Sequence, residues 1–502
     1  MTDILLGDLV ENVAHEHSSS TALVVGKTGS RITYQKLAEL VEQCAVRLST
    51  RGLLPGDVVG LRAANGVEYV IGLLGAARAG LIVVPLDPAL VSDEQQSRLH
   101  RTAARAVITD HPVDPRSPEI HVTVADSGSG PRCELSGTPG TATDPAAIGI
   151  TASDALVMFT SGTTAMPKMV PWTHAALRAA MANVAGAYQL RDTDGTVAVM
   201  PMFHGHGLVA GLLATLSTGG RLGIPCSGRF SPRTFSEEMN GVDATWFTAV
   251  PTIHQILLDV GAADEVGRGR LRFLRSCSAP LAPDVAQRLE TAFGAPMLPA
   301  FGMTEATHQA CAARPSSDAD TRIHTVGEPT GTELRITDDS GSSCATGIVG
   351  EVWLRGTSIA RGYLDNERAT AETFVDGWLR TGDLGSVDTN GVLTLRGRIK
   401  NIINRGGEKI SPEHVEDVLL AHPDITQAAV FGRSDTKYGE RVGAAVILRS
   451  GAPANEDLVR GFCASRLANY EVPEHISFVD ELPTTAKGSV DRNRLASEFD
   501  GA

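Results

Sequence analysis

Residues 57–85 read DVVGLRAANGVEYVIGLLGAARAGLIVVP, and three elements follow one another within this stretch. Asp57 to Arg62 is a short apolar run typical of a buried strand, and Gly80 to Pro85 is a second one. Between them, Glu68 to Ala79 has the length and composition of a helix. Strand–helix–strand units of this length build parallel, doubly wound sheets. The stretch therefore predicts an α/β fold.

The same alternation extends to both sides of this stretch. On its N-terminal side, Tyr34 to Arg51 places apolar residues at helical spacing, and Gly52 is a suitable stop. On its C-terminal side, the alternation resumes from Asp154 to about Thr325. The intervening residues 112–150 are rich in Pro, Ser, Gly and Thr, so we expect a poorly ordered surface excursion there.

The pattern changes after residue 326. Short alternating runs between turns, at Thr332–Ile336, Gly350–Arg355 and Gly391–Arg396, predict an antiparallel β subdomain. After Arg398 we expect a compact α+β tail, with a helix over 412–421 and strands near 428–431 and 442–448. The predicted organisation is a large domain of doubly wound sheets over 1–397, with its β subdomain over about 327–397, and a small domain over 398–502.

Composition bounds the class of protein. The chain has 502 residues, 42% of them apolar and 20% charged, which suits two or three packed domains. Its formal charge of −14 disfavours nucleic acid and anionic membranes as partners. Seven scattered cysteines fit a reducing, cytoplasmic setting better than a disulfide framework. We see neither a signal peptide nor a run near the roughly 20 apolar residues of a membrane span.

The first chemical motif is FTSGTTAMPK, residues 159–168. Its four hydroxyl side chains and one glycine follow an apolar strand, and Lys168 adds a positive charge. Such a loop can wrap an anion with backbone N–H groups, hydroxyls and an ammonium. The spacing is not that of a Walker loop, which disfavours a P-loop ATPase or kinase. The plain alternative is a solvated Ser/Thr turn.

Three further motifs follow. In FGMTE, residues 301–305, a carboxylate after a glycine turn suits magnesium, and the aromatic Phe301 could stack on a base. Asp383 could accept hydrogen bonds from both hydroxyls of a ribose, with Arg398 on the same sugar or a phosphate. The glycine pair Gly406-Gly407 allows a close backbone approach to a ligand. Ordinary turns, a hairpin Asp and a surface Arg would explain each motif taken alone.

These motifs, in this order over some 250 residues, closely resemble the adenylate-forming superfamily of acyl-coenzyme A synthetases, nonribosomal adenylation domains and luciferases. The likeness runs from Thr33-Tyr34 to Asp491-Arg492. It implies that a carboxylate attacks the α-phosphorus of ATP, that pyrophosphate leaves, and that a thiol then displaces AMP. It also implies that the small C-terminal domain is mobile and turns between the two half-reactions. Among members of the superfamily, the chain looks most like oxalate–coenzyme A ligases and the similar 4-coumarate ligases.

The resemblance implies a role for each motif residue. Glu305 is the expected metal ligand, for Mg²⁺, and Lys400 the expected hinge, while Gly406 and Gly407 lie beside the expected coenzyme A channel. The expected catalytic residues are Lys487, Thr304, Glu305 and His204. The expected ATP- and AMP-binding residues are Thr160, Ser161, Gly162, Thr163, Thr164, Lys168, Ser278, Ala279, Pro280, Phe301, Gly302, Met303, Thr304, Asp383 and Arg398.

Two positions depart from the superfamily pattern. Ala165 stands where the phosphate loop usually has a glycine, so the loop must avoid a positive φ there or bear strain. Ser489 stands where the adenylation lysine is usual, and the nearest lysine is Lys487, two residues earlier. An extended backbone keeps a two-residue shift on one face but moves the side chain by roughly 6–7 Å. Lysine is long and flexible, so Lys487 is our hypothesis for that role.

Histidines near the expected acyl site point to the acid. His204, His206 and His308 suit a short polar acid, because imidazolium donors pair with a second carboxylate. A buried neutral histidine is the alternative for each of them. Residues 275–280 would line the adenine side and the pocket wall, with Ser276 in the acyl pocket. We therefore expect oxalate or another short polar acid, rather than a fatty or aromatic one.

The expected substrates and cofactors are ATP, Mg²⁺, coenzyme A and a small carboxylic acid. We expect no nucleic acid and no membrane insertion, and we keep a homodimer open. Two alternatives remain at this point. One is an acyl-AMP ligase that loads a carrier protein or an amine, and the other is a nucleotide-binding relative with impaired adenylation, for which Ser489 is the best support.

Overall fold

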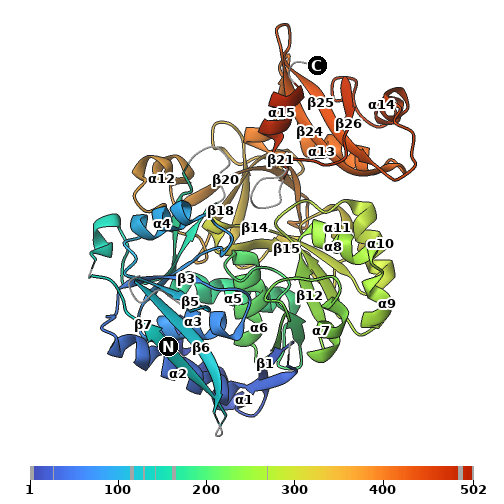
Figure 1. The fold of residues 1–502 in the computed structure, drawn as a ribbon. Coiled ribbons are helices and arrows are strands. Elements are labelled where there is room, and N and C mark those ends of the chain that lie inside the picture. Colours follow the sequence, from blue (N-terminus) through green and yellow to red (C-terminus); the bar gives the residue numbers. More distant parts are fainter. Residues whose placement is uncertain are drawn as a thin grey trace.

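The structure is a computed structural model, and it describes residues 5–26, 28–112, 118–127, 130–141, 143–160, 166–267, 269–483 and 490–499. A large N-terminal part carries four of its sheets, and a smaller C-terminal part stands at one end (Figure 1). This mixed α/β architecture confirms the predicted fold class.

A seven-stranded sheet is built around residues 57–85. Its strand order is β7-β6-β5-β3-β4-β8-β9, and the central strands β5, β3, β4 and β8 run parallel. The bounds are β3 (Val58–Arg62), β4 (Ile82–Pro85), β5 (Ala106–Thr109), β6 (Glu119–Ser127), β7 (Gly130–Gly137), β8 (Asp154–Phe159) and β9 (Met169–Thr173). Helices α2 (Tyr34–Thr50) and α3 (Val67–Arg78) match the predicted helices within a residue. The Thr33 hydroxyl caps α2 by accepting a hydrogen bond from the backbone N–H of Lys36.

The prediction for residues 112–150 was wrong in its main part. Instead of a surface excursion, β6 and β7 form an antiparallel pair that extends the seven-stranded sheet by two strands. The polar composition hides an alternation in which Ile120, Val122 and Cys133 are fully buried. Gly130 and Gly137 have positive φ and lie at the ends of β7. Composition therefore marked the turns and not the strands between them.

Two more sheets complete the core of the N-terminal part. One has the order β12-β13-β14-β15-β16, in which β12, β13 and β14 are parallel and β15 and β16 antiparallel. Its bounds are β12 (Trp246–Ala249), β13 (Phe273–Ser276), β14 (Met297–Met303), β15 (His308–Ala312) and β16 (Glu328–Pro329). The other has the order β10-β11-β1-β2, with bounds β10 (Gly195–Val197), β11 (Arg221–Ile224), β1 (Thr21–Val25) and β2 (Ser30–Thr33).

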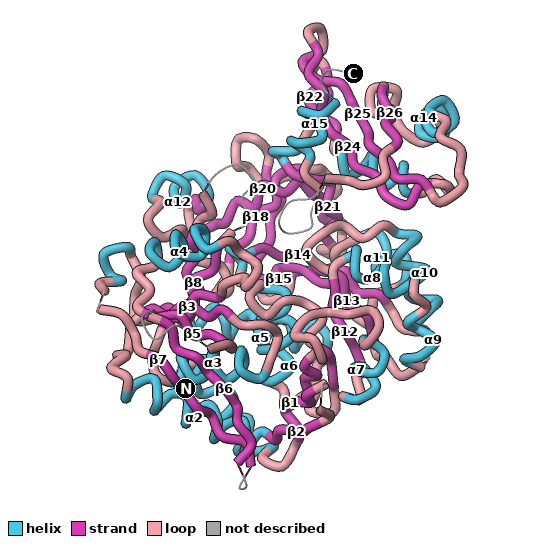
Figure 2. Tube along the Cα trace, in the orientation of Figure 1, coloured by secondary structure: helices cyan, strands magenta, loops and turns pink. Residues whose placement is uncertain are grey.

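Helices pack around these sheets, as Figure 2 shows. Near the later strands they are α5 (His174–Tyr188), α6 (Ala214–Ser217), α7 (Phe235–Gly241), α8 (Pro251–Asp259), α9 (Ala262–Val266), α10 (Pro283–Phe293) and α11 (Ala319–His324). Elsewhere lie α1 (Leu9–His17), α4 (Ser92–Arg101) and α12 (Glu367–Thr373). Residues 206–213 form a π-helix, a conformation that is rare and often found at functional sites.

The predicted β subdomain is an antiparallel sheet. Its order is β17-β18-β20-β19, and β21 pairs with β20. The bounds are β17 (Glu333–Thr337), β18 (Gly350–Arg355), β19 (Phe374–Val375), β20 (Trp378–Val387) and β21 (Leu393–Arg398). This sheet encloses an apolar cluster of its own, to which β14 contributes Phe301.

The C-terminal part has a separate sheet and core, drawn in orange and red in Figure 1. The sheet order is β23-β22-β25-β24, with β26 against β25. The bounds are β22 (Ile403–Arg405), β23 (Glu408–Ile410), β24 (Ile425–Asp435), β25 (Gly439–Leu448), β26 (His475–Phe478), α13 (Pro412–Leu420), α14 (Glu456–Ala464) and α15 (Arg492–Phe499). One sheet ends at Arg398 and the next begins at Ile403, so the domain boundary that we propose at 397/398 lies one residue before the end of β21.

Two expectations from composition can be compared with the structure. All seven cysteines are free thiols, five of them buried. Within the described ranges, no helix is both long and apolar enough to cross a bilayer.

The tight contact between α2 and α3 gives a test of packing. A Cβ atom added at Gly75 would lie 2.6 Å from Sγ of Cys44, which α2 holds fully buried. We predict that Gly75→Ala lowers the free energy of unfolding by about 1–3 kcal/mol, because overpacking forces the helices apart. Chemical denaturation of the purified protein measures this change.

The matched control is Gly186→Ala in α5, where an added Cβ would meet no atom within 4 Å. That substitution should leave stability unchanged or raise it by about 0.4–1 kcal/mol. Equal effects of the two substitutions would contradict the packing described for α2 and α3.

Candidate active site

A fully buried arginine lies where several predicted site segments meet. Arg275, on β13, has no exposed surface, and its Nε donates to the Tyr188 hydroxyl at 2.9 Å. Its Nη1 donates to Nε2 of His206 and to Oγ1 of Thr248, both at 3.0 Å. Its Nη2 donates to Nε2 of His308 at 3.0 Å and to Oε1 of Gln309 at 2.9 Å. We call these six residues the Arg275 cluster.

Within the described part of the chain, Arg275 forms no ion pair, and every partner in its cluster is a neutral group. A buried guanidinium usually has a carboxylate partner, because an uncompensated charge is costly in a low-dielectric interior. All five of its N–H groups are nevertheless used in hydrogen bonds, which is the full donor capacity of arginine. The cluster therefore carries one positive charge without a matching negative one.

The two histidines of the cluster are neutral, which corrects the predicted imidazolium donors. Burial first, and then the charge of Arg275, holds the pKa of both His206 and His308 well below the ordinary value. The positive charge predicted for these histidines thus resides on Arg275, which was expected to line the adenine side and the pocket wall. The prediction was wrong because His206 and His308, which are distant in the sequence, both accept hydrogen bonds from the guanidinium of Arg275.

The hydrogen bonds of Arg275 also assign the imidazole tautomers. Since Nε2 of each ring accepts from the guanidinium, each ring carries its proton on Nδ1. In His206, Nδ1 lies 3.1 Å from Oγ of Ser278. In His308, no residue of the described chain accepts from Nδ1. The cluster therefore presents an N–H donor polarised by a buried positive charge.

Three residues of this region, which includes the Nδ1–H donor of His308, have strained backbone conformations. Ser278, Thr307 and His308 have φ values of 76°, 49° and 83°, in the left-handed region that non-glycine residues seldom adopt. The two imidazole rings stack with their centroids 5.3 Å apart. Such strained residues cluster at functional sites, where the surrounding structure holds them in place.

The other residues predicted near the acyl site lie outside the hydrogen bonds of the cluster. His204 lies against Phe203, with ring centroids 4.6 Å apart, and a charge on it would lower the pKa of His206 further. Ser276 follows Arg275 on β13, and successive strand residues point to opposite faces. Its buried Oγ atom has no hydrogen-bond partner in the described structure. By this alternation Ser276 faces away from Arg275, and its place in the acyl pocket stays a prediction.

The metal motif forms a short turn at the end of β14. Glu305 is buried, and one oxygen of its carboxylate accepts a 2.8 Å hydrogen bond from the Tyr363 hydroxyl. The carbonyl of Thr304 accepts from the Trp172 indole at 2.7 Å. Gly302 is required here, because an added Cβ would lie 1.5 Å from the carbonyl oxygen of His308. Met303, which lies between Gly302 and Thr304 in the sequence, is half-buried.

The predicted stacking role of Phe301 is wrong for this structure. Its side chain is 6% exposed and packs inside the apolar cluster of the β subdomain with Val352, Leu354 and Leu393. The alternation of β14 turns this ring into the core. Ser278, Ala279 and Pro280, which follow β13, are exposed and remain proposed adenine contacts.

The predicted ribose residues face each other across two strands. Asp383 pairs with Arg398 in the register of β20 and β21, and Oδ1 lies 2.7 Å from Nε of Arg398. The other oxygen, Oδ2, is buried and has no partner in the described structure. Burial raises the pKa of Asp383, and Arg398 opposes this shift. A buried, vacant acceptor beside a cation fits a hydroxyl-bearing ligand.

The phosphate-loop prediction lies only partly within the described residues. The Thr160 backbone N–H donates to the Lys168 carbonyl at 2.9 Å, and the Thr160 hydroxyl accepts from the Lys168 N–H at 3.1 Å. These bonds close the two ends of the loop. Ser161, Gly162, Thr163, Thr164 and Ala165 lie outside the described residues, as do Lys487 and Ser489.

The remaining predicted residues belong to the domain junction and the C-terminal sheet. Lys400 lies in a short 3₁₀ turn (Ile399–Asn401) between the last strand of the β subdomain and β22. Gly406 and Gly407 form the turn between β22 and β23, with φ values of 63° and 98° that favour glycine. The Gly406 N–H donates to the Tyr438 carbonyl at 2.7 Å.

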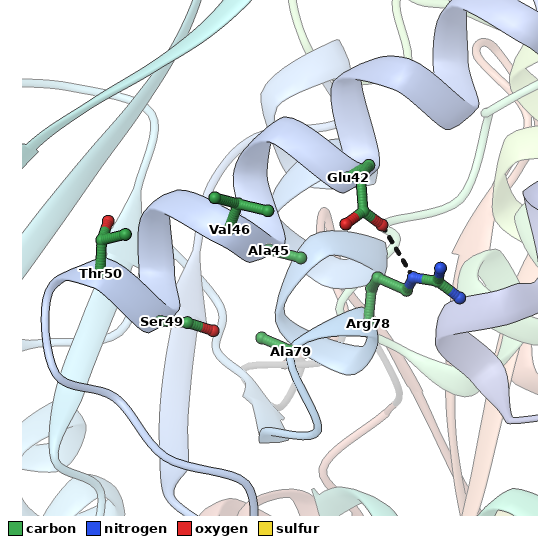
Figure 3. A pocket seen from close by; sticks show the side chains of 7 residues that line it. All are labelled: Glu42, Ala45, Val46, Ser49, Thr50, Arg78 and Ala79. Carbon is green, nitrogen blue, oxygen red and sulfur yellow. Dashed lines mark hydrogen bonds and ion pairs between the residues drawn. The ribbon is translucent and has the colours of Figure 1, made fainter.

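A hollow of about 400 Å³ on the surface lies away from this chemistry (Figure 3). In it, Glu42 pairs with Arg78, which also pairs with Asp8 and Glu11. None of its lining residues belongs to the Arg275 cluster. They are Glu42, Ala45, Val46, Ser49, Thr50, Arg78 and Ala79.

Comparisons with known proteins agree with this arrangement. The family model of AMP-binding enzymes matches residues 10–364, and that of the AMP-binding enzyme C-terminal domain matches residues 414–489. The chain is 42% identical over 508 residues to the oxalate–CoA ligase of Arabidopsis thaliana, which covers 98% of both proteins. It is 33% identical to the oxalate–CoA ligase of Saccharomyces cerevisiae, over 96% of this chain and 95% of that protein.

A solved structure is also similar. ATP-bound MatB from Rhodopseudomonas palustris superposes with a TM-score of 0.85 at 25% identity, and the match covers 98% of this chain and 99% of that one.

The buried histidine beneath Arg275 predicts a pH dependence of stability. Burial lowers the pKa of His254 to about 4, and its Nε2 lies 3.1 Å from the carbonyl oxygen of Arg275. The unfolded chain then binds a proton that the folded chain does not, between about pH 6.5 and 4. The stability that neutral His254 contributes is fully present above this window and is lost as the pH falls through it.

Replacing His254 by Gln should therefore reduce the slope of unfolding free energy against pH by up to about 1.4 kcal/mol per pH unit inside this window. Denaturant titrations at several pH values measure the slope, and a titration at pH 8 isolates the pH-independent cost of the substitution. An unchanged slope would contradict the neutral, buried state of His254.

Proposed function

This chain belongs to the AMP-binding enzyme family and is an acid–thiol ligase, and we propose that the acid it activates is oxalate. The enzyme forms an acyl-adenylate from ATP and a carboxylic acid with release of pyrophosphate, and then forms a thioester with coenzyme A. The sequence prediction of an AMP-forming acyl-CoA synthetase is thereby confirmed. ATP and coenzyme A are its substrates, while the identity of the acid is our proposal.

The observation that carries the proposal is the uncompensated charge of Arg275. Oxalate has two carboxylates, and only one of them attacks ATP. The second stays ionised after the first has become part of the mixed anhydride with AMP, so it needs a positive environment. The Arg275 cluster offers that environment through the Nδ1–H of His308, because a hydrogen bond to an ionised acceptor is strengthened by nearby positive charge.

The size of the acid follows from burial. His206, His308 and Thr248 are 4%, 6% and 1% exposed, so the side chains around Arg275 are already closely packed. A long apolar chain would have to displace hydrogen-bonded polar groups there, which is costly. A two-carbon diacid adds charge with little volume. The similarity to oxalate–CoA ligases from a plant and a yeast supports the same choice.

Magnesium is part of the proposal, and the residues fit it. The described residues contain no group of three or more metal-ligating side chains, and Glu305 is the single carboxylate at the end of β14. Mg²⁺ commonly binds through one or two carboxylates together with substrate phosphates, so a lone glutamate suits it. When bound, the ion would offset the repulsion between the two anionic reactants.

The chain's own residues would then do the following. Lys168 and the Thr160 end of the phosphate loop bind phosphate oxygens, while Asp383 accepts from a ribose hydroxyl at its vacant Oδ2. Arg398 holds Asp383 in place through its ion pair. Lys487 stays our hypothesis for the lysine that meets the α-phosphate.

The C-terminal domain supplies the second half-reaction in this proposal. Lys400 serves as the hinge between the two sheets, and Gly406-Gly407 lies beside coenzyme A after the domain turns. The open turn at these glycines and the separate core of residues 403–478 support an independent movement of this part. Assembly into a homodimer stays a prediction from sequence.

An acid panel tests the proposed substrate. Pyrophosphate release is measured with oxalate, malonate, acetate, hexanoate and 4-coumarate, each with and without coenzyme A. We expect the highest kcat/KM with oxalate, and a thioester product only when coenzyme A is present. Activity confined to hexanoate or 4-coumarate would overturn the choice of acid. No release with any acid would favour a nucleotide-binding relative with impaired adenylation, as Ser489 suggests.

The buried charge can be removed with little change of volume. In Arg275→Met, we predict that kcat/KM for oxalate falls by about 100-fold, as is typical when one partner of a buried charged hydrogen bond is lost. Affinity for an ATP analogue should stay within about threefold of the unmodified enzyme, since a threefold change is under 1 kcal/mol.

The matched control is Arg355→Met, which removes an exposed guanidinium paired with Glu333 on the β subdomain. This variant should keep full activity with oxalate, because exposed ion pairs contribute little. Arg275→Met with undiminished preference for oxalate would show that the second carboxylate binds elsewhere.

A further inference from the structure

Residues 358–364 connect the metal turn to the phosphate-loop hairpin, and we call them the bridging segment. At its first end, the Thr307 hydroxyl donates to the Ser358 carbonyl at 2.6 Å. The Ala360 N–H donates to the Glu305 carbonyl at 2.8 Å. Both bonds are formed with residues beside or within the turn that carries Glu305, so this end follows the position of that turn.

The other end of the bridging segment is tied to β8 and β9. The guanidinium of Arg361 pairs with the fully buried carboxylate of Asp154, with Nη2 2.7 Å from Oδ2. The Leu364 N–H donates to the Met169 carbonyl at 2.9 Å. Met169 follows Lys168 directly, so the segment spans from the expected metal ligand to the expected phosphate cation.

Tyr363, within this segment, contacts both of those charged groups. Its hydroxyl donates to Oε1 of Glu305 at 2.8 Å. Its ring centroid lies 4.3 Å from Nζ of Lys168, which is within cation–π distance. One side chain thus meets an anion at its edge and a cation over its face.

The ring itself is held firmly. The Tyr363 N–H donates to the Thr370 hydroxyl at 2.9 Å, and Phe374 packs edge-on against the ring at 5.5 Å. Only 8% of Tyr363 is exposed. Because these contacts hold the ring in one position, the ring can in turn restrict the positions of Lys168 and Glu305, which contact it.

Lys168 and Glu305 do not pair with each other, although both contact the same ring. Opposite charges that share a partly buried site attract strongly, because the effective dielectric constant there is low. If they paired, the ammonium would be lost to the phosphates and the carboxylate to the metal. The ring of Tyr363, which contacts both groups, would prevent this pairing and so both losses.

We propose that Tyr363 is a positioning residue that keeps the Lys168 ammonium and the Glu305 carboxylate apart and aimed at the nucleotide. The inference rests on the roles proposed above for Lys168 and Glu305, and not on the identity of the acid. The ring supplies the separation, and the hydroxyl orients the carboxylate. These two contributions can be separated by substitution, because Tyr363→Phe removes only the hydroxyl and Tyr363→Met removes the ring as well.

Calorimetric titration with a non-hydrolysable ATP analogue, without any acid, tests the inference. Without Mg²⁺, Tyr363→Phe should bind the analogue within about twofold of the unmodified protein, and Tyr363→Met at least about fivefold more weakly, in line with the loss of a desolvated cation–π contact. With Mg²⁺, Tyr363→Phe should lose about fivefold or more of the affinity that the ion adds, because a hydrogen bond to a charged group has been removed.

A double-mutant cycle identifies the group through which the ring acts. If the ring acts on Lys168, then Tyr363→Met should weaken binding very little in a Lys168→Met background. Independent, multiplicative losses would overturn the inference, and so would an unchanged affinity in Tyr363→Met or in Lys168→Met. Failure of oxalate in the acid panel would leave this result untouched, which separates the two proposals.

The control is Tyr34→Phe, which removes another buried phenol hydroxyl, bonded to the carbonyls of Leu216 and Gly220. Tyr34 contacts neither Lys168 nor Glu305, so analogue affinity should not change. Thermal melting confirms that each variant is folded. If Tyr363→Met does not fold, Tyr363→Leu replaces it, and the loss of the Mg²⁺-dependent gain in Tyr363→Phe still decides whether the hydroxyl orients Glu305.

Discussion

The buried guanidinium of Arg275 constrains the side chains that surround it in the candidate acyl site. Its five N–H groups are used by Tyr188, His206, Thr248, His308 and Gln309, so these side chains cannot rotate without leaving a buried donor unpaired. Burial, and then this charge, lowers the pKa of both imidazoles. The hydrogen bonds that their Nε2 atoms accept from the guanidinium place their protons on Nδ1. The resulting site carries a positive charge but has no free guanidinium donor. In our proposal, its ligand is a small dianion, whose negative charge complements that positive charge.

The residues proposed to bind the nucleotide are positioned in a different way. There each charged group already has a partner that positions it: Asp383 has Arg398, and Glu305 and Lys168 share Tyr363. Glu305 and Lys168 lie beside different sheets, and the bridging segment joins these two places. In our proposal, binding of ATP depends on the relation between two parts of the N-terminal domain, whereas the choice of acid depends on the Arg275 cluster.

The sequence predicted the elements whose patterns are local. The helix from Tyr34, the strands around residues 57–85 and the turn at Gly406-Gly407 were found because each shows its own periodicity or turn residues. The strands β6 and β7 were missed because their polar composition masks an alternation of buried residues. The role of Arg275 and the core position of Phe301 could not be found, since both depend on which residues of other strands lie opposite them. Tyr363 was missed for the same reason, because its two partners lie 58 and 195 positions away in the sequence.

We propose that the second carboxylate of a short diacid binds at the Arg275 cluster. A crystal structure of the enzyme with AMP and oxalate would locate that carboxylate. We expect one carboxylate beside the AMP phosphate and the other within about 3 Å of Nδ1 of His308, the usual length of such a bond. Oxalate bound with its second carboxylate turned away from His308, with that Nδ1 still unpaired, would rule out this binding mode.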